Sequence, residues 1–341
     1  MAPVRTLSEQ SYRSTTNRLG ITLLAFELLL NVIGVVVAVI AIVLELIPGL
    51  DMVTKDCIDQ ISYGLLYVLI FVLPALLYFL ISGRQRTAPI LFATKWRMET
   101  VAYLFVGLAV ISATAHINAD LVSVFDFTVY LPEELLPTVA TTPTNNYQLV
   151  LMIFTTAIVP AFVEELLFRG IVLSNLMPYG KTTAVLASAF LFGIMHQNPA
   201  QFLYATAAGL VLGYIYIKTR SIWTVILLHF VNNFISVIET VLEERLLAHT
   251  AELALLVLEA GIFLLGLLAA VYLILRYRDQ RRAVLAQGCF EMDLQTDTDV
   301  TVQDLSFGTQ VRLFFSIPMI VFLVICALMM IPNFLALSLL A

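Results

Sequence analysis

Charged residues are scarce in this chain. Only 12% of its 341 residues are Asp, Glu, Lys or Arg, and 60% are hydrophobic, whereas an average soluble domain has about a quarter charged residues. This composition excludes an ordinary soluble fold, and a formal net charge of −6 gives no indication of nucleic-acid binding. Cysteine is also rare. Cys57, Cys289 and Cys326 do not share one oxidising face of the expected topology, so we predict no disulfide.

Long apolar runs take the place of the missing charge. A helix needs about 20 apolar residues to cross the roughly 30 Å of hydrocarbon in a bilayer. Each run is expected to be helical, because lipid offers the backbone no hydrogen-bond partners. We therefore predict an all-α fold, a polytopic transmembrane helical bundle with about eight to nine membrane-spanning helices. The runs lie at 20–47, 61–82, 99–120, 148–177, 182–198, 200–217, 221–241, 252–275 and 313–340.

The basic residues lie almost entirely on one side of these runs. Of the 18 Lys and Arg residues, only Lys55, Arg169 and Arg245 fall outside the segments that would face the cytoplasm. Basic residues are retained on the cytoplasmic side of membrane proteins. The distribution predicts a multi-pass protein of the plasma membrane with its N-terminus in the cytoplasm.

Composition also divides the chain into three units. A polar, partly acidic stretch at 276–312 is typical of a cytoplasmic linker and separates the last run from the others. The units are residues 1–144, with the N-terminal transmembrane helices and an outer loop; residues 145–245, the core with intramembrane polar residues; and residues 246–341, with the C-terminal transmembrane helices and the linker.

Polar side chains occur in three central runs, where lipid should exclude them. Burial of an ionisable group in hydrocarbon costs several kcal/mol unless the group is paired or used, so these residues are functional candidates. Counted from the expected inner helix ends, they lie roughly 12 to 21 Å deep and can meet at one level. They are Glu164, Glu165 and Arg169 in the run 148–177, His196, four residues after Phe192, in 182–198, and His229 and Asn233 in 221–241.

Helical spacing assigns different tasks to the two glutamates. Glu165 and Arg169 stand four residues apart on one helix face, which predicts a supporting ion pair. Glu164 shares its face with Phe168, so it has no charged partner on its own helix and can point to another part of the bundle. A carboxylate in an apolar pocket is suited to accept a proton from water, so Glu164 with His196 could generate a nucleophilic water.

The third polar pair suits the other half of a hydrolytic reaction. His229 and Asn233 offer hydrogen-bond donors for the oxyanion that forms when water attacks a carbonyl, and one such donor is commonly worth roughly 10²–10³ in rate. Together the residues indicate amide hydrolysis without a cofactor. Glu with two His could instead bind zinc, although the chain has no HExxH spacing. Ser188 and Ser236 stay open as nucleophiles.

The three clusters resemble a known pattern. EELLFR at 164–169, FGIMH at 192–196 and HFVNN at 229–233 resemble the motifs of the CAAX protease and bacteriocin-processing family, also called the ABI family, which includes type II CAAX prenyl endopeptidases. The resemblance covers roughly 145–241. It implies an intramembrane glutamate protease that acts on a membrane-associated or lipidated (CaaX-like) peptide or protein.

The same resemblance implies roles for individual residues. Glu164 and His196 would activate water, and His229 and Asn233 would form the oxyanion hole. Older descriptions of the family as metalloproteases keep zinc as the alternative cofactor. A different class, a non-catalytic transporter or peptide-binding scaffold, would use the polar cluster as a binding pocket. The chain shows no paired halves with broken helices, which would favour a transporter.

Overall fold

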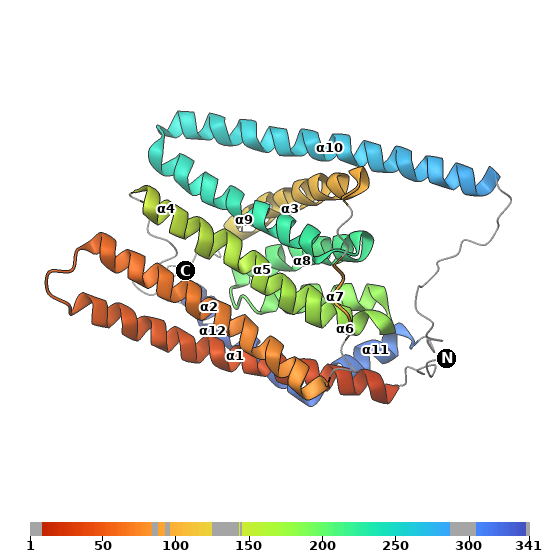
Figure 1. Ribbon diagram of the computed structural model, residues 1–341, viewed down its shortest axis with the longest axis horizontal. Coiled ribbons are helices and arrows are strands. Elements are labelled where there is room, and N and C mark those ends of the chain that lie inside the picture. The colour runs from red at the N-terminus through yellow and green to blue at the C-terminus, as the bar shows by residue number, and fades with distance from the viewer. Residues whose placement is uncertain are drawn as a thin grey trace.

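The computed structural model describes residues 9–83, 88–92, 96–124, 143, 145–286 and 305–338. These residues form a bundle of helices without a strand among them (Figure 1). The elements are α1 (Glu9–Glu45), α2 (Met52–Ser82), α3 (Met98–Val124), α4 (Asn146–Met152), η1 (Ile153–Ile158), α5 (Val159–Glu165), η2 (Leu166–Leu173), α6 (Ser174–Leu176), η3 (Met177–Tyr179), α7 (Lys181–Ile194), α8 (Pro199–Thr219), α9 (Ile222–Arg245), α10 (Ala248–Ala286), α11 (Phe307–Phe314) and α12 (Ile317–Ser338).

The polytopic helical bundle expected from the sequence is confirmed. Within the described residues, 7 helices are long and apolar enough to cross a membrane, or up to 8 if α11 and α12, which are bent by 71°, count as one span. One expected span is wrong. The run 182–198 holds α7, which has only 14 residues and ends at Ile194, and the chain then reverses into α8.

Two other expectations, the cytoplasmic linker and the outer loop, concern segments that lie partly outside the described residues. α10 continues to Ala286, past the expected start of the linker at 276, and residues 287–304 of that linker lie outside the described chain. The outer loop expected at 121–147 also lies mostly outside it. Cys57 and Cys326 are free thiols, whereas Cys289 is not among the described residues.

One span passes through the middle of the bundle. Residues 146–179 form a single rod from α4 to η3, and Asn145 caps its start by accepting a hydrogen bond from the amide of Gln148. Two stretches of this rod, η1 and η2, are wound as π-helix. π-Helical turns are rare and occur often at functional sites. They flank α5, which carries both glutamates.

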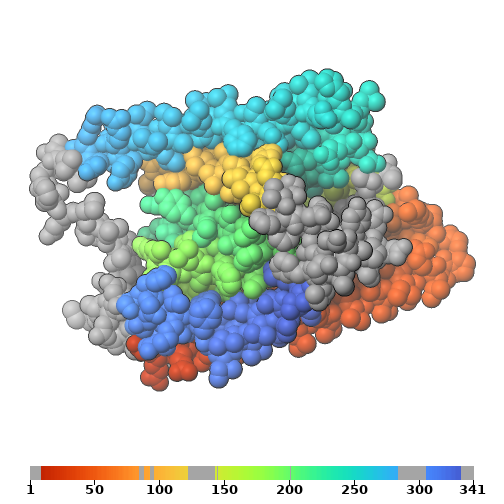
Figure 2. Space-filling view, turned by 180° about the vertical axis from the view of Figure 1, so that it is seen from behind, coloured from red at the N-terminus to blue at the C-terminus, as the bar shows by residue number. Residues whose placement is uncertain are grey.

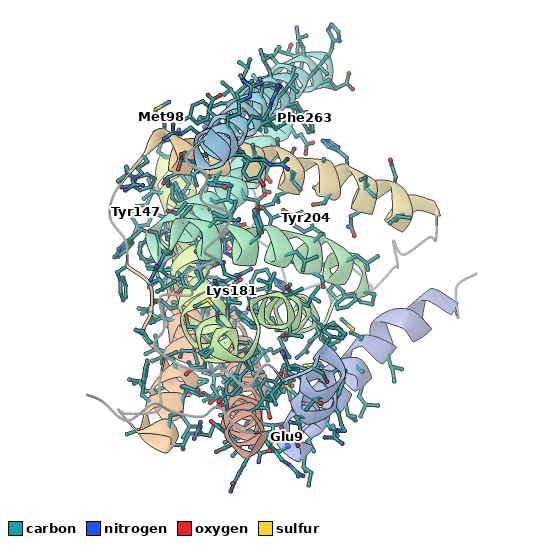
Figure 3. The ribbon with its side chains drawn as sticks, turned by 90° about the vertical axis from the view of Figure 1, so that its right-hand side faces the viewer. Glu9, Met98, Tyr147, Lys181, Tyr204 and Phe263 are labelled. Carbon is teal, nitrogen blue, oxygen red and sulfur yellow. The ribbon has the colours of Figure 1, made fainter. Side chains whose placement is uncertain are left out.

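The other helices surround this rod. α1, α2 and α12 pack on one side of it, and α3 and α10 pack together on the other; from behind, α12 covers α1 and α10 forms the opposite border (Figure 2). Seen from the end at which α1 begins, Glu9 and Phe263 lie at opposite edges, with Lys181 between them (Figure 3). The start of α1 and the Arg-rich end of α10 lie at the same end of the bundle (Figure 1).

α7 and α8 form a closely packed hairpin. A Cβ added at Gly209 of α8 would lie 2.9 Å from the Cα of Ala189 of α7, and one added at Gly193 would lie 2.8 Å from the Phe202 carbonyl oxygen. Only glycine permits these helices to approach so closely, as small residues do in many membrane helix pairs. The hairpin therefore holds its tip, Met195–Asn198, in a defined place beside α1 and α5.

Candidate active site

Glu164 lies in α5 with its side chain buried, and its exposed fraction is only 4%. Its Oε1 accepts a hydrogen bond of 2.6 Å from the hydroxyl of Tyr67 in α2. Its Oε2 lies 4.0 Å from Nε2 of His229 in α9. The sequence analysis left Glu164 without a partner, and the structure supplies one from a helix outside the core unit.

Glu165 is at the centre of a buried charge network. Its Oε1 accepts from NH1 of Arg169 at 2.8 Å and lies 2.9 Å from Nδ1 of His229. Both Glu165 and Arg169 are fully buried. Arg169 also donates to the carbonyl of Gly209 at 3.2 Å. The expected ion pair is present, and it is joined to His229, which the spacing alone did not indicate.

Phe192 lies at the meeting point of three polar side chains. The guanidinium carbon of Arg169 lies 4.5 Å from the centre of its ring, in the geometry of a cation–π contact. The rings of His196 and His229 contact it edge to face, with centroids 5.2 and 5.9 Å away. Phe192 therefore separates the two imidazoles and brings them to the same region.

His196 is not on a helix face, and this expectation is wrong. α7 ends at Ile194, and His196 lies in the turn that follows. Its Nδ1 is 2.8 Å from the carbonyl oxygen of Phe192. Because a carbonyl only accepts, Nδ1 must carry the proton, and Nε2 of the neutral ring is then an acceptor. The imidazole is half-buried.

Asn233 is held by an irregularity in the central rod. Pro160 has no N–H, so it cannot give the carbonyl of Thr156 the hydrogen bond that an α-helix would supply. Nδ2 of Asn233 donates to that carbonyl at 3.1 Å, and Asn233 in turn accepts from Asn232 at 3.2 Å. This contact gives Asn233 a structural task beside any chemical one.

The alternative groups considered for the chemistry are placed less favourably. The hydroxyl of Ser188 donates to the carbonyl of Phe168 at 3.0 Å, and Ser236 is exposed on the outer surface of α9. Within the described part of the chain, no three His, Cys, Asp or Glu side chains are grouped as metal ligands. The donor set does not fit zinc, and we derive no step through a metal.

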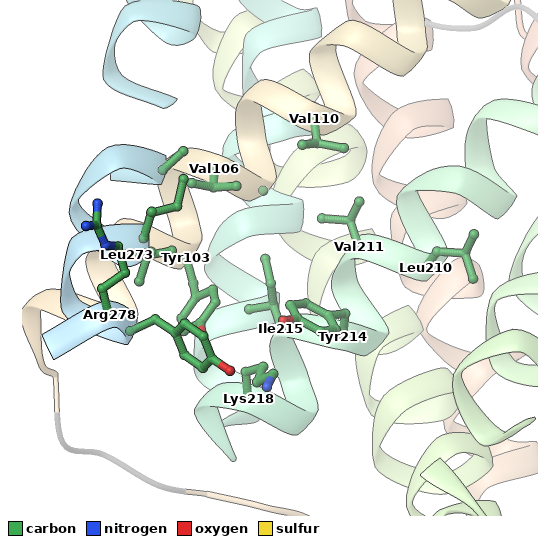
Figure 4. Close-up of a pocket in the computed structure, with 14 residues that line it drawn as sticks. Tyr103, Val106, Val110, Leu210, Val211, Tyr214, Ile215, Lys218, Leu273 and Arg278 are labelled. Atoms are coloured by element: carbon green, nitrogen blue, oxygen red, sulfur yellow. The ribbon is translucent and has the colours of Figure 1, made fainter. Parts of the chain in front are cut away.

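A cavity of about 680 Å³ lies elsewhere, between α3, α8 and α10 (Figure 4). Its walls are mostly apolar, with Lys218 and Arg278 among the lining residues. None of the six candidate residues lines it. The polar cluster is therefore a packed arrangement inside the bundle and not the wall of this cavity.

Two functional candidates were missed by the sequence analysis. Tyr67 lies within an apolar run. The one sequence pattern that could have drawn attention to it is an aromatic stripe with Tyr63 and Phe71, one residue at every fourth position. Glu27 lies in the first apolar run, and nothing in the sequence indicated that it bonds Gln197. Both partners come from helices that precede the core unit.

The polar cluster is built around a buried carboxylate and two histidines, and comparisons with known proteins match the segment that holds it. Residues 146–235 match the family model described as type II CAAX prenyl endopeptidase Rce1-like. Glu164, His196, His229 and Asn233 all lie within this Rce1-like segment, so the family resemblance is confirmed over it. No solved structure matches the chain.

One curated relative is similar over a segment of comparable length. A Bacillus subtilis (strain 168) protein named "Putative membrane peptidase YdiL" is 37% identical over 91 residues. The similarity covers 26% of this chain and 36% of the relative, so the chain spans little more than a third of the length of the relative that it matches.

Proposed function

We propose that this protein is a membrane-embedded endopeptidase in which Glu164 and His196 activate water for attack on a peptide bond. The observation that carries the proposal is the 4.0 Å separation between Oε2 of Glu164 and Nε2 of His229 in a buried site. This separation is too long for a direct hydrogen bond. A water oxygen about 2.8 Å from each atom would bond both, at an angle of roughly 90°.

Glu164 is well placed to accept a proton from that water. Tyr67 occupies Oε1, which leaves Oε2 directed to the reacting side. The proton moves from water to Glu164, the resulting hydroxide adds to the carbonyl carbon, the C–N bond breaks, and the proton passes to the departing amine. Nε2 of His196, with Nδ1 fixed by Phe192, accepts a hydrogen bond from the same water and orients it.

His229 and Asn233 serve the oxyanion in this proposal. Nδ1 of His229 faces the carboxylate of Glu165 at 2.9 Å, so the ring donates from Nε2 only when it carries both protons. Glu165 and its ion pair with Arg169 hold that imidazole in place, as buried partners orient catalytic histidines generally. Asn233 uses one amide hydrogen on Thr156 and has a second for the oxyanion.

The substrate that we propose is a membrane-associated or lipidated peptide or protein, including CaaX-like ends. The buried site supports this, because a substrate must reach it from within the bilayer. The family description as a prenyl endopeptidase supports the same class. We further propose a location in the plasma membrane with a cytoplasmic N-terminus, because the start of α1 and the end of α10, two segments that contain arginines, lie at one end of the bundle (Figure 1).

Cleavage of lipidated peptides by purified protein tests the proposal. Wild type, Glu164→Gln and the control Glu259→Gln are incubated with a library of prenylated and unmodified membrane peptides, and products are identified by mass spectrometry. Glu259 lies in α10 and pairs with His116, away from the cluster. We expect cleavage by wild type and the control, a loss of at least about 10³-fold in Glu164→Gln, and unchanged rates after chelator treatment.

Three outcomes would contradict the proposal. Equal cleavage by wild type and Glu164→Gln would show that the carboxylate is not the base, and loss of cleavage in chelator, restored by zinc, would favour a metalloprotease. Binding of peptides without any cleavage under all conditions would favour the transporter or scaffold class.

A further inference from the structure

A second buried carboxylate lies close to the candidate site but belongs to α1. Glu27 is only 2% exposed. Nε2 of Gln197 donates to its Oε1 and Oε2 at 2.8 and 2.7 Å, and Nδ2 of Asn31 donates to Oε1 at 2.9 Å. The thiol of Cys326 in α12 lies 3.8 Å from Oε2. These donors are neutral, so burial of this carboxylate is offset by hydrogen bonds and not by a cation.

Gln197 occupies a strained position in the chain. Its φ of 53° lies in the left-handed region, which costs a non-glycine residue roughly 1–2 kcal/mol. Such a conformation persists only where its surroundings impose it, and it is typical of functional sites. Here the two hydrogen bonds to Glu27 hold the side chain, and the amide of Gln197 bonds the carbonyl of Ile194 at 3.1 Å.

The residue before Gln197 is His196. The turn closes α7 with two backbone bonds, from His196 to Gly193 at 3.2 Å and from Gln197 to Ile194. The direction of the His196 imidazole therefore depends on the backbone of a turn that the pair Gln197–Glu27 ties to α1.

We propose that Glu27 is a positioning residue, which holds Gln197 in its left-handed conformation and thereby aims the imidazole of His196 at the reacting water beside Glu164. The inference rests on the proposed function for its catalytic consequence. It also assigns a task to α1, which lies outside the Rce1-like segment at 146–235. The core would then depend on a carboxylate that the core itself does not contain.

An exchange of donor and acceptor tests the inference. Glu27→Gln replaces one of the two oxygens that accept from Nε2 of Gln197 with an NH₂ donor, and Gln197→Glu places a carboxylate against a carboxylate. Each single variant should lower kcat about 10- to 100-fold with KM unchanged, as losses of orienting partners commonly do. The double variant Glu27→Gln/Gln197→Glu restores one donor facing one acceptor, and we expect its kcat within about threefold of wild type.

A control separates positioning from general packing. Cys326→Ala removes another contact of Glu27 without touching the turn, and kcat should stay near that of wild type. An equal loss in Cys326→Ala, or a double variant no better than the singles, would overturn the inference. The inference would also be overturned if all variants lowered the thermal midpoint together and kcat fell only in proportion to the folded fraction.

Hydrogen exchange tests the tie without any substrate. Backbone amides of residues 194–198 should exchange faster in Glu27→Gln than in wild type and return to the wild-type rate in the double variant. Unchanged exchange in Glu27→Gln would refute the positioning role, whatever the activity. If wild type cleaves no peptide in a Glu164-dependent way, the proposed function fails, and the exchange result still decides whether Glu27 holds the turn.

Discussion

Replacing Arg169 should destabilise this protein far more than replacing a cation whose acidic partner is exposed. NH1 of Arg169 lies 2.8 Å from Oε1 of Glu165, and both side chains are fully buried. Nζ of Lys55 lies at the same 2.8 Å from Oε2 of Glu45, but the Glu45 side chain is 76% exposed. Breaking a buried pair costs about 3–5 kcal/mol, because the partner is left charged and desolvated. An exposed pair is worth about 0–1 kcal/mol.

A double-mutant cycle gives the magnitude for the pair itself. Arg169→Met leaves the Glu165 carboxylate with His229 alone, and Glu165→Gln leaves the guanidinium with the Gly209 carbonyl and the Phe192 ring. Each single change should cost about 3–5 kcal/mol. The double change removes both charges and keeps an acceptor for His229, so its cost should fall below the sum by about 2 kcal/mol or more.

The free energy of unfolding, measured by denaturing-detergent titration of the purified protein in mixed micelles, checks these values. Lys55→Met, which removes the partner of the exposed Glu45, serves as the control and should change it by less than about 1 kcal/mol. Additive costs for the two single variants, or a loss of under about 1 kcal/mol in Arg169→Met, would refute the reasoning that burial makes this pair costly to break.

Two further predictions concern single side chains. Tyr67→Phe removes the 2.6 Å bond to Glu164; a bond to a charged group contributes about 1.5–3 kcal/mol to stability, so the free energy of unfolding should fall by about that amount. Peptide cleavage should slow about 10- to 100-fold beyond any loss of folded protein, because the proposed base loses the partner that orients it, and an unchanged rate would deny that bond a catalytic role. Gly209→Val would force a side chain against Ala189 and should lower the free energy of unfolding by about 1–3 kcal/mol, whereas Gly261→Ala, with open space around it, should not.

Much of this arrangement could be predicted from local sequence patterns. Hydropathy located the spans, because the bilayer imposes one requirement on every helix. The i,i+4 spacing of Glu165 and Arg169 predicted their pairing, since α-helical geometry fixes which side chains share a face. The roles of Glu164, His196, His229 and Asn233 in chemistry stay predictions, because no measurement of activity bears on them.

What could not be predicted depends on contacts between distant parts of the chain. Tyr67 and Glu164 are 97 positions apart, and Gln197 and Glu27 are 170 apart; no local period reports such pairs. The early end of α7 did have a signal. Gln197, Asn198 and Pro199 form a polar, proline-containing stretch of the kind that marks a turn, but the average hydropathy of the neighbouring residues concealed it.

Asn233 allows the structural and chemical tasks of one residue to be separated. In wild type, Asn233→Ala leaves the Thr156 carbonyl without its donor at 3.1 Å, which should cost about 1–3 kcal/mol of unfolding free energy. Pro160→Ala supplies an amide N–H at position 160 that can bond the same carbonyl. In that background the stability cost of Asn233→Ala should largely disappear.

Cleavage activity should respond differently in the same two backgrounds. If Asn233 donates to the oxyanion, Asn233→Ala should slow cleavage by about 10²–10³-fold with or without Pro160→Ala, because the new N–H satisfies Thr156 and not the substrate. The comparison requires that Pro160→Ala alone retains activity. Recovery of cleavage together with stability in the double variant would mean that Asn233 acts only by holding the central rod.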